Sequence, residues 1–176
     1  MEQLTYRKAG PADLAAVLEL YDKIIDGPTN YTGWARGYYP TEDVARAGID
    51  RGETWLVYLG AALVATLTLN SRQPEAFLEG RWKVNCLPEQ VMVIHTFMVD
   101  PAFGGRGIGR ACMDFARQQA EEAGMRALRL DVYVSNPPAI KLYEQTCGYH
   151  YCGTVDLLKA GPAVRIKWFR LYELAL

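Results

Sequence analysis

The stretch that most constrains the fold covers residues 91–110, VMVIHTFMVDPAFGGRGIGR. From Val91 to Val99 the chain is apolar except at His95 and Thr96, and β-branched residues are frequent. Such a run is typical of a strand covered on both faces of its sheet. Pro101 follows it, and proline has no N–H to donate to a neighbouring strand. We therefore expect a buried strand that stops near residue 99.

A glycine turn and a helical pattern follow this strand directly. The glycines are Gly104, Gly105, Gly107 and Gly109. Apolar residues at helical spacing then predict an amphipathic helix; they are Ile108, Ala111, Cys112, Phe115, Ala116, Ala120 and Ala123. A strand, a glycine turn and a helix N-terminus favour phosphate binding, because first-turn N–H groups are unpaired, the helix dipole attracts anions and glycines let the backbone approach.

The spelling of this turn differs from two common phosphate-binding loops. A Walker loop ends in Gly-Lys-Ser/Thr, whereas Gly109 is followed by Arg110-Ala111. A dinucleotide fingerprint is G-x-G-x-x-G/A, and its last position falls on Arg110 or on Cys112 in the two possible frames. The turn is therefore another kind of phosphate loop or a plain strand-to-helix connection.

A second strand and helix are expected over residues 128–149, LRLDVYVSNPPAIKLYEQTCGY. The apolar run at its start predicts a strand over residues 128–134. Asn136 and Pro137 suit the N-cap and first position of a helix that Gly148 closes. At helical spacing, one face of this helix carries Asn136, Ala139, Ile140 and Tyr143.

Both stretches resemble motifs of the GCN5-related N-acetyltransferase (GNAT) superfamily. R-G-x-G after V-D-P is similar to its motif A, Gln/Arg-x-x-Gly-x-Gly/Ala; Gly107 and Gly109 match, but Gly104 stands where Gln or Arg is usual. N-x-x-A-I-x-L-Y-E-x-x-x-G-Y, from Asn136 to Tyr149, is similar to motif B. The resemblance is specific over residues 91–149 and generic over residues 1–90.

The resemblance implies an α/β fold with a single mixed central sheet of about seven strands and flanking helices, in the order β-α-α-β-β-β-α-β-α-β-β. The residue pattern agrees with it. Strands are expected over residues 4–9, 54–59, 61–70, 91–99, 128–134, 149–157 and 164–174, and the first two helices after Gly10-Pro11 and Thr41. Residues 1–176 are expected to form a single domain, a size that suits one core.

The resemblance also implies acetyl-CoA as cosubstrate. Its pantetheine arm is expected to pair with backbone groups of Phe97, Met98 and Val99. The phosphate contacts are expected to map to Gly105, Arg106, Gly107, Ile108, Gly109 and Arg110. Arg106 and Arg110 would then supply the charge that is missing at Gly104, and Asn136 would contact the cofactor while it caps its helix.

Acetyl transfer from a thioester to an amine makes three physical demands. The amine must lose a proton, the thioester oxygen needs a fixed hydrogen-bond donor, and the leaving thiolate needs a proton. The resemblance implies the N–H of Met98 or Val99 as the donor and Tyr143 as the acid. The alternative for Tyr143 is a core tyrosine whose hydroxyl is satisfied locally.

The general base is open among three candidates. Asp131 lies five positions before Asn136. This chain resembles the ribosomal-protein N-terminal acetyltransferases here, because they carry a catalytic Glu at the corresponding position. Its alternative is an ion pair with Arg129 or Arg126, or a position at a solvent-facing edge. His95, a lone histidine in an apolar strand, is the second candidate. Water relayed to another carboxylate is the third.

Composition excludes several other classes of protein. Nineteen basic residues nearly balance 20 acidic ones, so an electrostatic nucleic-acid binder is disfavoured. No apolar run is as long as a membrane span, and MEQLTYRKAG lacks the apolar part of a signal peptide, so we expect a cytoplasmic protein. No C-x-x-C pair occurs, which predicts free thiols and no metal site at Cys86, Cys112, Cys147 and Cys152.

The acceptor is expected to be a small-molecule amine or a peptide. Aromatic residues gather in regions that shape the acceptor site in the resembled family: Tyr31, Trp34, Tyr38, Tyr39 and Trp168. Aromatic faces attract both apolar and cationic groups, although these rings could simply cover the helices. Two other functions remain open, a CoA-binding sensor or docking module without turnover and an ATP-binding regulator. The apolar end of the chain, residues 168–176, suggests a homodimer.

Overall fold

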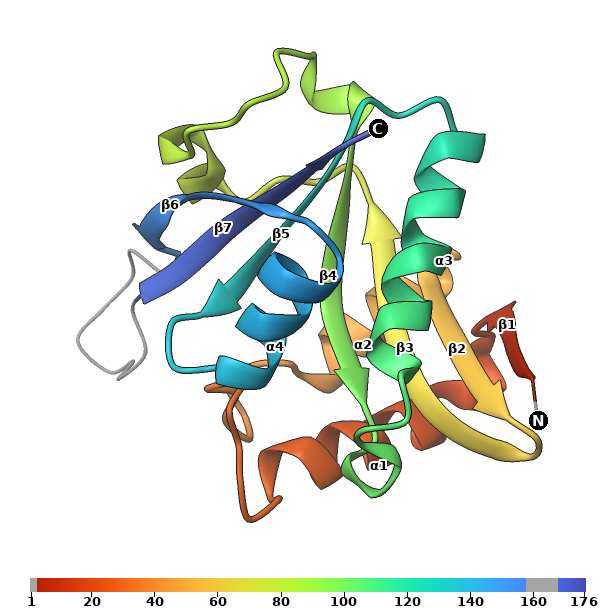
Figure 1. Cartoon of the computed structure of the whole chain (residues 1–176). Coiled ribbons are helices and arrows are strands. Elements are labelled where there is room, and N and C mark those ends of the chain that lie inside the picture. Colours follow the sequence, from red (N-terminus) through yellow and green to blue (C-terminus); the bar gives the residue numbers. More distant parts are fainter. Residues whose placement is uncertain (1–2, 158–167) are drawn as a thin grey trace. The chain divides into compact units, whose positions relative to one another are not determined.

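A mixed seven-stranded sheet organises the residues that the structure describes, 3–157 and 168–176. The structure is a computed structural model, and Figure 1 labels its elements. The strands are β1 (Leu4–Lys8), β2 (Thr54–Leu59), β3 (Ala62–Asn70), β4 (Val91–Val99), β5 (Ala127–Tyr133), β6 (His150–Asp156) and β7 (Trp168–Ala175). The helices are α1 (Leu14–Ile25), α2 (Glu42–Asp50), α3 (Ile108–Glu122) and α4 (Pro137–Lys141).

The sheet order is β1-β2-β3-β4-β5-β7-β6. The order of elements along the chain is the predicted one, so the predicted α/β fold with a mixed sheet and flanking helices is confirmed. The start of the last predicted strand, residues 164–167, lies outside the described residues.

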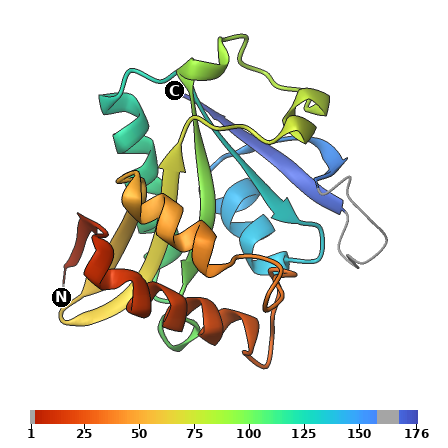
Figure 2. The same ribbon diagram turned by 180° about the vertical axis from the view of Figure 1, so that it is seen from behind.

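One compact unit contains Trp34–Leu69 and His95–Cys112 together with the described residues up to Asn30. In it β1, β2 and β3 pair antiparallel in chain order. α1 and α2 lie across one face of these strands, as Figure 2 shows from behind. Its buried cluster combines residues from both helices, β2 and β4 with one residue that follows β1: Ala9, Val17, Leu20, Tyr21, Ala45, Ile49, Leu56 and Met98.

The second compact unit contains Tyr31–Gly33, Asn70–Ile94 and the described part of Met113–Leu176. Here the start of β4 runs parallel to the start of β5, with Val91 opposite Ala127 and Val93 opposite Arg129. β7 lies between β5 and β6 and is antiparallel to both. Its buried cluster contains Ala76, Phe77, Val91, Val93, Ala127, Cys152, Val155 and Leu171.

Candidate functional site

The end of β4 is fixed by Asp100, which is buried. Its backbone N–H donates to the Val64 carbonyl at 2.8 Å, and its carboxylate accepts from the Ala102 N–H at 2.9 Å. Lys23 of α1 lies 3.1 Å from the same carboxylate. These contacts end the strand and begin a short 3₁₀ turn, Pro101–Phe103, within the first unit.

The glycine turn then leads into α3 through two left-handed residues. Gly105 has a φ of 75° and Gly107 a φ of 78°, values that glycine adopts without the clash a Cβ would cause. The Ala111 N–H donates to the Gly107 carbonyl at 3.1 Å, so α3 begins directly after the second glycine. The N–H groups of the first turn precede this bond and have no carbonyl one turn back, which suits an anion.

Gly104, the departure from motif A, has an ordinary backbone with a φ of −57°. A Cβ built there would lie 3.3 Å from the Pro101 carbonyl, so a side chain would need only a small adjustment. Steric crowding therefore does not explain why the loop lacks a polar side chain at this position. Arg106 is exposed, with its guanidinium carbon 5.2 Å from the centre of the Phe103 ring.

The predicted cofactor strand ends with alternating burial. Met98 is buried in the cluster of the first unit, whereas Phe97, Val99 and His95 are half-buried. Thr96 has a φ of 43°, which is rare for a β-branched residue and costs about 1–3 kcal/mol. Sequence reasoning noted only that Thr96 interrupts the apolar run, because a left-handed backbone leaves no mark in the spelling.

In the second unit, α4 begins as predicted. The Asn136 side chain accepts from the Ala139 N–H at 3.2 Å and caps the helix, with Pro137 at its first position. After α4 the backbone widens into a π-helical turn, Leu142–Thr146, a feature that is frequent at functional sites. Tyr143 lies in this turn and is buried.

Tyr143 packs among other tyrosines. Its ring centroid lies 5.8 Å from that of Tyr149 and 5.8 Å from that of Tyr172. The Tyr172 hydroxyl donates to Glu144 at 2.5 Å, and Arg170 lies 3.2 Å from the same carboxylate. Glu144 is exposed, and β7 supplies its carboxylate with two partners.

Asp131 of β5 has the environment of a tuned carboxyl group. Its side chain is half-buried, and desolvation by its surroundings raises its pKa to about 7. Arg129, the partner considered from sequence, instead pairs with Glu173 at 3.0 Å. Among the described residues Asp131 forms no ion pair, so no cation in that part of the chain lowers its pKa.

Asp131 and Tyr143 belong to opposite faces of the β5–β7 ladder. Asp131 is opposite Leu171, whereas Leu130 is opposite Tyr172, and neighbouring residues of a strand point to opposite faces. Because Tyr143 packs on Tyr172, it lies on the Leu130 face. The β5–β7 ladder therefore lies between the side chains of Asp131 and Tyr143.

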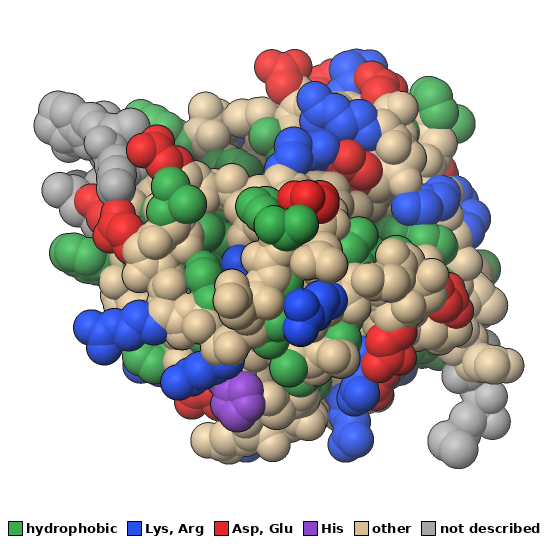
Figure 3. Space-filling view, turned by 90° about the horizontal axis from the view of Figure 1, so that it is seen from above, with side chains coloured by type: hydrophobic (Ala, Val, Ile, Leu, Met, Phe, Trp, Pro, Cys, Tyr) green, Lys and Arg blue, Asp and Glu red, His purple; other side chains and the backbone are tan. Residues whose placement is uncertain are grey.

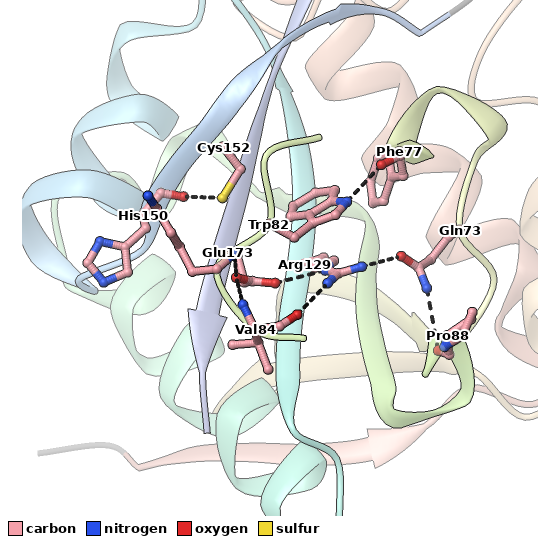
Figure 4. Close-up of polar contacts among 10 residues, drawn as sticks. Gln73, Phe77, Trp82, Val84, Pro88, Arg129, His150, Cys152 and Glu173 are labelled. Atoms are coloured by element: carbon pink, nitrogen blue, oxygen red, sulfur yellow. Dashed lines mark hydrogen bonds and ion pairs between the residues drawn. The ribbon is translucent and has the colours of Figure 1, made fainter. Parts of the chain in front are cut away.

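A buried charge cluster, shown in Figure 4, holds residues 71–88 against β5 and β7. Arg129 donates to Glu173, to Gln73 at 2.9 Å and to the Val84 carbonyl at 3.4 Å, and its guanidinium carbon lies 4.1 Å from the centre of the Trp82 ring. Residues 80–86 and Arg129 line an open cavity of about 430 Å³. Sequence reasoning missed this cluster because it depends on the register of β5 and β7.

Part of the predicted acceptor loop is well anchored in the first unit. The rings of Trp34 and Tyr39 meet edge to face at 6.0 Å, and the Asn30 amide donates to the Trp34 carbonyl at 2.7 Å. Tyr38 is 66% exposed, so its ring is accessible to a ligand. In the second unit, Trp168 is also exposed.

Within residues 3–157 and 168–176, no group of three or more His, Cys, Asp and Glu side chains could hold a metal ion. No helix in this part of the chain is long and apolar enough to span a membrane. On the face in Figure 3, acidic and basic side chains lie next to one another rather than in separate fields.

The structure gathers the predicted residues in two groups. The first unit holds His95, the cofactor strand Phe97, Met98 and Val99, and the loop Gly105, Arg106, Gly107, Ile108, Gly109 and Arg110. The second unit holds Asp131, Asn136 and Tyr143.

Comparison with known proteins agrees with these motifs. An archaeal relative, an uncharacterized N-acetyltransferase of Methanocaldococcus jannaschii, is 32% identical over 143 residues. The match covers 80% of this chain but 58% of that protein, so this chain spans about three fifths of the relative's length.

Solved structures share the fold. A GNAT-family acetyltransferase from Streptococcus agalactiae superposes with a TM-score of 0.78 at 19% identity, covering 98% of this chain and 95% of that one. The acetyltransferase yncA from Salmonella typhimurium, solved with its cofactor acetyl-CoA, has a TM-score of 0.70 at 17% identity over 99% and 94% of the two chains. The sequence profile of the acetyltransferase (GNAT) family matches residues 18–149. With that match over most of its length, the chain belongs to the acetyltransferase (GNAT) family.

Proposed function

We propose that this protein transfers an acetyl group from acetyl-CoA to a primary amine by direct attack in a ternary complex. The observation that carries the proposal is the end of β4 followed by the left-handed Gly105 and Gly107 and the start of α3. This arrangement presents backbone N–H groups to an anion without any Walker lysine. It suits the pyrophosphate of CoA better than the phosphates of a magnesium-bound nucleotide.

The residues of the loop, from Gly105 to Arg110, would hold the phosphates, and Asn136 would add a contact from α4. The backbone of Phe97, Met98 and Val99 would pair with the pantetheine arm. The N–H of Met98 or Val99 would donate to the thioester oxygen as negative charge develops there. A fixed donor of this kind is worth about 3–4 kcal/mol in related oxyanion sites.

The amine supplied to this site must be neutral, because an ammonium has no lone pair. For a lysine-like amine this costs about 4–5 kcal/mol at pH 7. Asp131 would accept the proton, and its pKa of about 7 suits a base that works near neutral pH. His95, or a water relayed to another carboxylate, is the alternative base.

The chemistry supplied by acetyl-CoA is an activated acyl carbon, to which the amine nitrogen forms a bond while the C–S bond breaks. Tyr143 would donate its proton to the departing sulfur, which leaves as the thiol.

The acceptor we propose is a small-molecule amine or a peptide with an apolar or cationic body. The exposed ring of Tyr38 and the anchored rings of Trp34 and Tyr39 support this choice, since aromatic faces attract both kinds of group.

Release of the CoA thiol in the presence of an amine panel tests the proposal. We expect an amine-dependent rate in the wild type and a rate lower by about 10²–10⁴-fold in Tyr143→Phe, which keeps the ring but lacks the acid. Thiol release that no amine stimulates, despite acetyl-CoA binding, would favour a CoA sensor. An unchanged rate in Tyr143→Phe would remove Tyr143 from the mechanism.

A further inference from the structure

Thr96 is the one non-glycine residue with a positive φ among the residues that the structure describes. It lies inside β4, it is buried, and its branched Cβ disfavours the left-handed backbone it adopts. A residue persists in such a conformation only when its surroundings over-determine it. The contacts of its side chain therefore indicate what fixes the backbone at this point.

A chain of buried and half-buried hydroxyl groups surrounds Thr96 within the first unit. The Thr96 hydroxyl donates to Thr68 of β3 at 3.3 Å, and Thr68 lies 3.1 Å from the Thr54 hydroxyl of β2. Tyr21 of α1 also hydrogen-bonds to Thr96. The Thr96 hydroxyl therefore has hydrogen-bond partners on both α1 and β3.

The Tyr21 hydroxyl keeps one protonation state at every ordinary pH. Burial raises its pKa to about 12, so it stays protonated. α1, β4, β3 and β2 are thereby joined by one series of hydrogen bonds that passes through the strained residue.

This series bears on the cofactor strand because Phe97, Met98 and Val99 follow Thr96 directly. At their far end, the Asp100 N–H is bonded to Val64 of β3. The segment is thus tied to β3 on both sides, and Met98 packs in the same buried cluster as Tyr21. Any change in φ at Thr96 would rotate the peptide groups that come next.

We infer that Thr96, held by the Tyr21 and Thr68 hydroxyls, is a positioning residue that aims the backbone groups of Phe97, Met98 and Val99 at the acyl-pantetheine arm. The inference rests on the proposed function, since it requires acetyl-CoA to lie along β4. The hydroxyl of Thr96, rather than the size of its side chain, holds these backbone groups in place.

Calorimetric titration with two ligands tests the inference without any acceptor amine. Acetyl-CoA carries the arm, whereas 3′-phospho-ADP is the same nucleotide end without it. The variants are Thr96→Val, which keeps the branched shape but loses the hydroxyl, and Tyr21→Phe, which removes only the phenolic oxygen. Thr96→Ser keeps the hydroxyl and is the matched control.

We expect Thr96→Val and Tyr21→Phe to bind acetyl-CoA about tenfold more weakly and to bind 3′-phospho-ADP within twofold of the wild type. Thr96→Ser should bind both ligands as the wild type does. If Thr96→Val fails to fold, Tyr21→Phe gives the same comparison, because removal of one oxygen creates no cavity.

Wild-type affinity for acetyl-CoA in Tyr21→Phe would overturn the inference alone. Equal weakening of both ligands would also overturn it, since a purely structural role does not separate the arm from the nucleotide. A wild-type protein that binds neither ligand would overturn the proposed function, and this inference with it.

Discussion

Asp131 shows how its surroundings change the acid–base properties of one side chain. A carboxyl group of ordinary pKa is fully ionised at pH 7 and is a weak base. Desolvation at Asp131 raises the pKa to about 7, and the cation nearest in sequence, Arg129, is engaged by Glu173. The group is therefore basic enough to accept a proton at a pH where half of it is already ionised.

The raised pKa also predicts how stability depends on pH. The folded state binds the Asp131 proton more tightly than the unfolded chain does. This proton therefore adds to the free energy of unfolding below pH 4, and the contribution is lost as pH rises through 7. Asp131→Asn cannot ionise. We expect it to be more stable than the wild type at pH 8, by at most about 4 kcal/mol, and the difference to shrink toward pH 4. Urea unfolding at several pH values measures it, and a pH-independent difference would contradict the prediction.

Enzymatic activity should rise over the pH range in which this contribution to stability is lost. Once an acceptor is known, kcat/KM of the wild type should rise with pH through about 7, because the base must be ionised. Asp131→Asn should lose about 10²–10⁴-fold in kcat/KM together with that pH step. Retention of the step in Asp131→Asn would assign the base to His95 or to a relayed carboxylate.

In the proposed function, cofactor binding depends on the turn before α3. Gly107→Ala places a Cβ on a residue whose φ is 78°, at a cost of about 1–2 kcal/mol, and relaxation there would move the N–H groups of the first turn. We expect acetyl-CoA to bind about tenfold more weakly, as measured by calorimetry.

Gly124→Ala is a matched control for this prediction. Gly124 follows the other end of α3, has a φ of 68° and, like Gly107, has open space around its Cβ position. It should lose similar stability but keep wild-type affinity for acetyl-CoA. Equal loss of affinity in both variants would mean that the effect is one of general destabilisation.

The segment of residues 71–88 depends on the buried Glu173. Its carboxylate pairs with Arg129 and accepts the N–H groups of Lys83 and Val84 at 2.7 and 2.9 Å. Glu173→Gln leaves a buried cation without its counter-charge, which costs about 3–5 kcal/mol and lowers Tm by about 10 °C. Amide exchange at Lys83 and Val84 should accelerate. Glu121→Gln, which removes the exposed pair with Arg117, should cost less than about 1 kcal/mol.

At the scale of elements, sequence reasoning succeeded where periodicity or capping decides the outcome. β4 has the predicted bounds, and α2 and α4 begin after their predicted caps, Thr41 and Asn136. It failed where the outcome depends on partners distant in sequence. The left-handed Thr96 has its hydrogen-bond partners, Tyr21 and Thr68, on other elements, and the Arg129–Glu173 pair needs the β5–β7 register.

For the whole molecule, the family motifs predicted the fold class because they place a strand, a loop and a helix in a fixed order. The homodimer stays a prediction with a weaker basis. β7 is paired on both edges, by β5 and β6, and Phe169, Leu171 and Tyr172 are buried, so these three apolar residues are covered without a second copy, whereas Trp168 and Leu176 are exposed. The acceptor also stays a proposal, since aromatic rings select a class of ligand rather than one compound.

Thermal unfolding of the whole protein with acetyl-CoA, CoA, ATP and NAD, in separate samples, tests whether the protein binds acetyl-CoA as its cosubstrate. A ligand at a hundred times its Kd adds about 2.7 kcal/mol to the folded state, which raises Tm by about 5–10 °C for a chain of this size. We expect this shift with acetyl-CoA and CoA only. No shift with either CoA compound, or an equal shift with ATP, would contradict it.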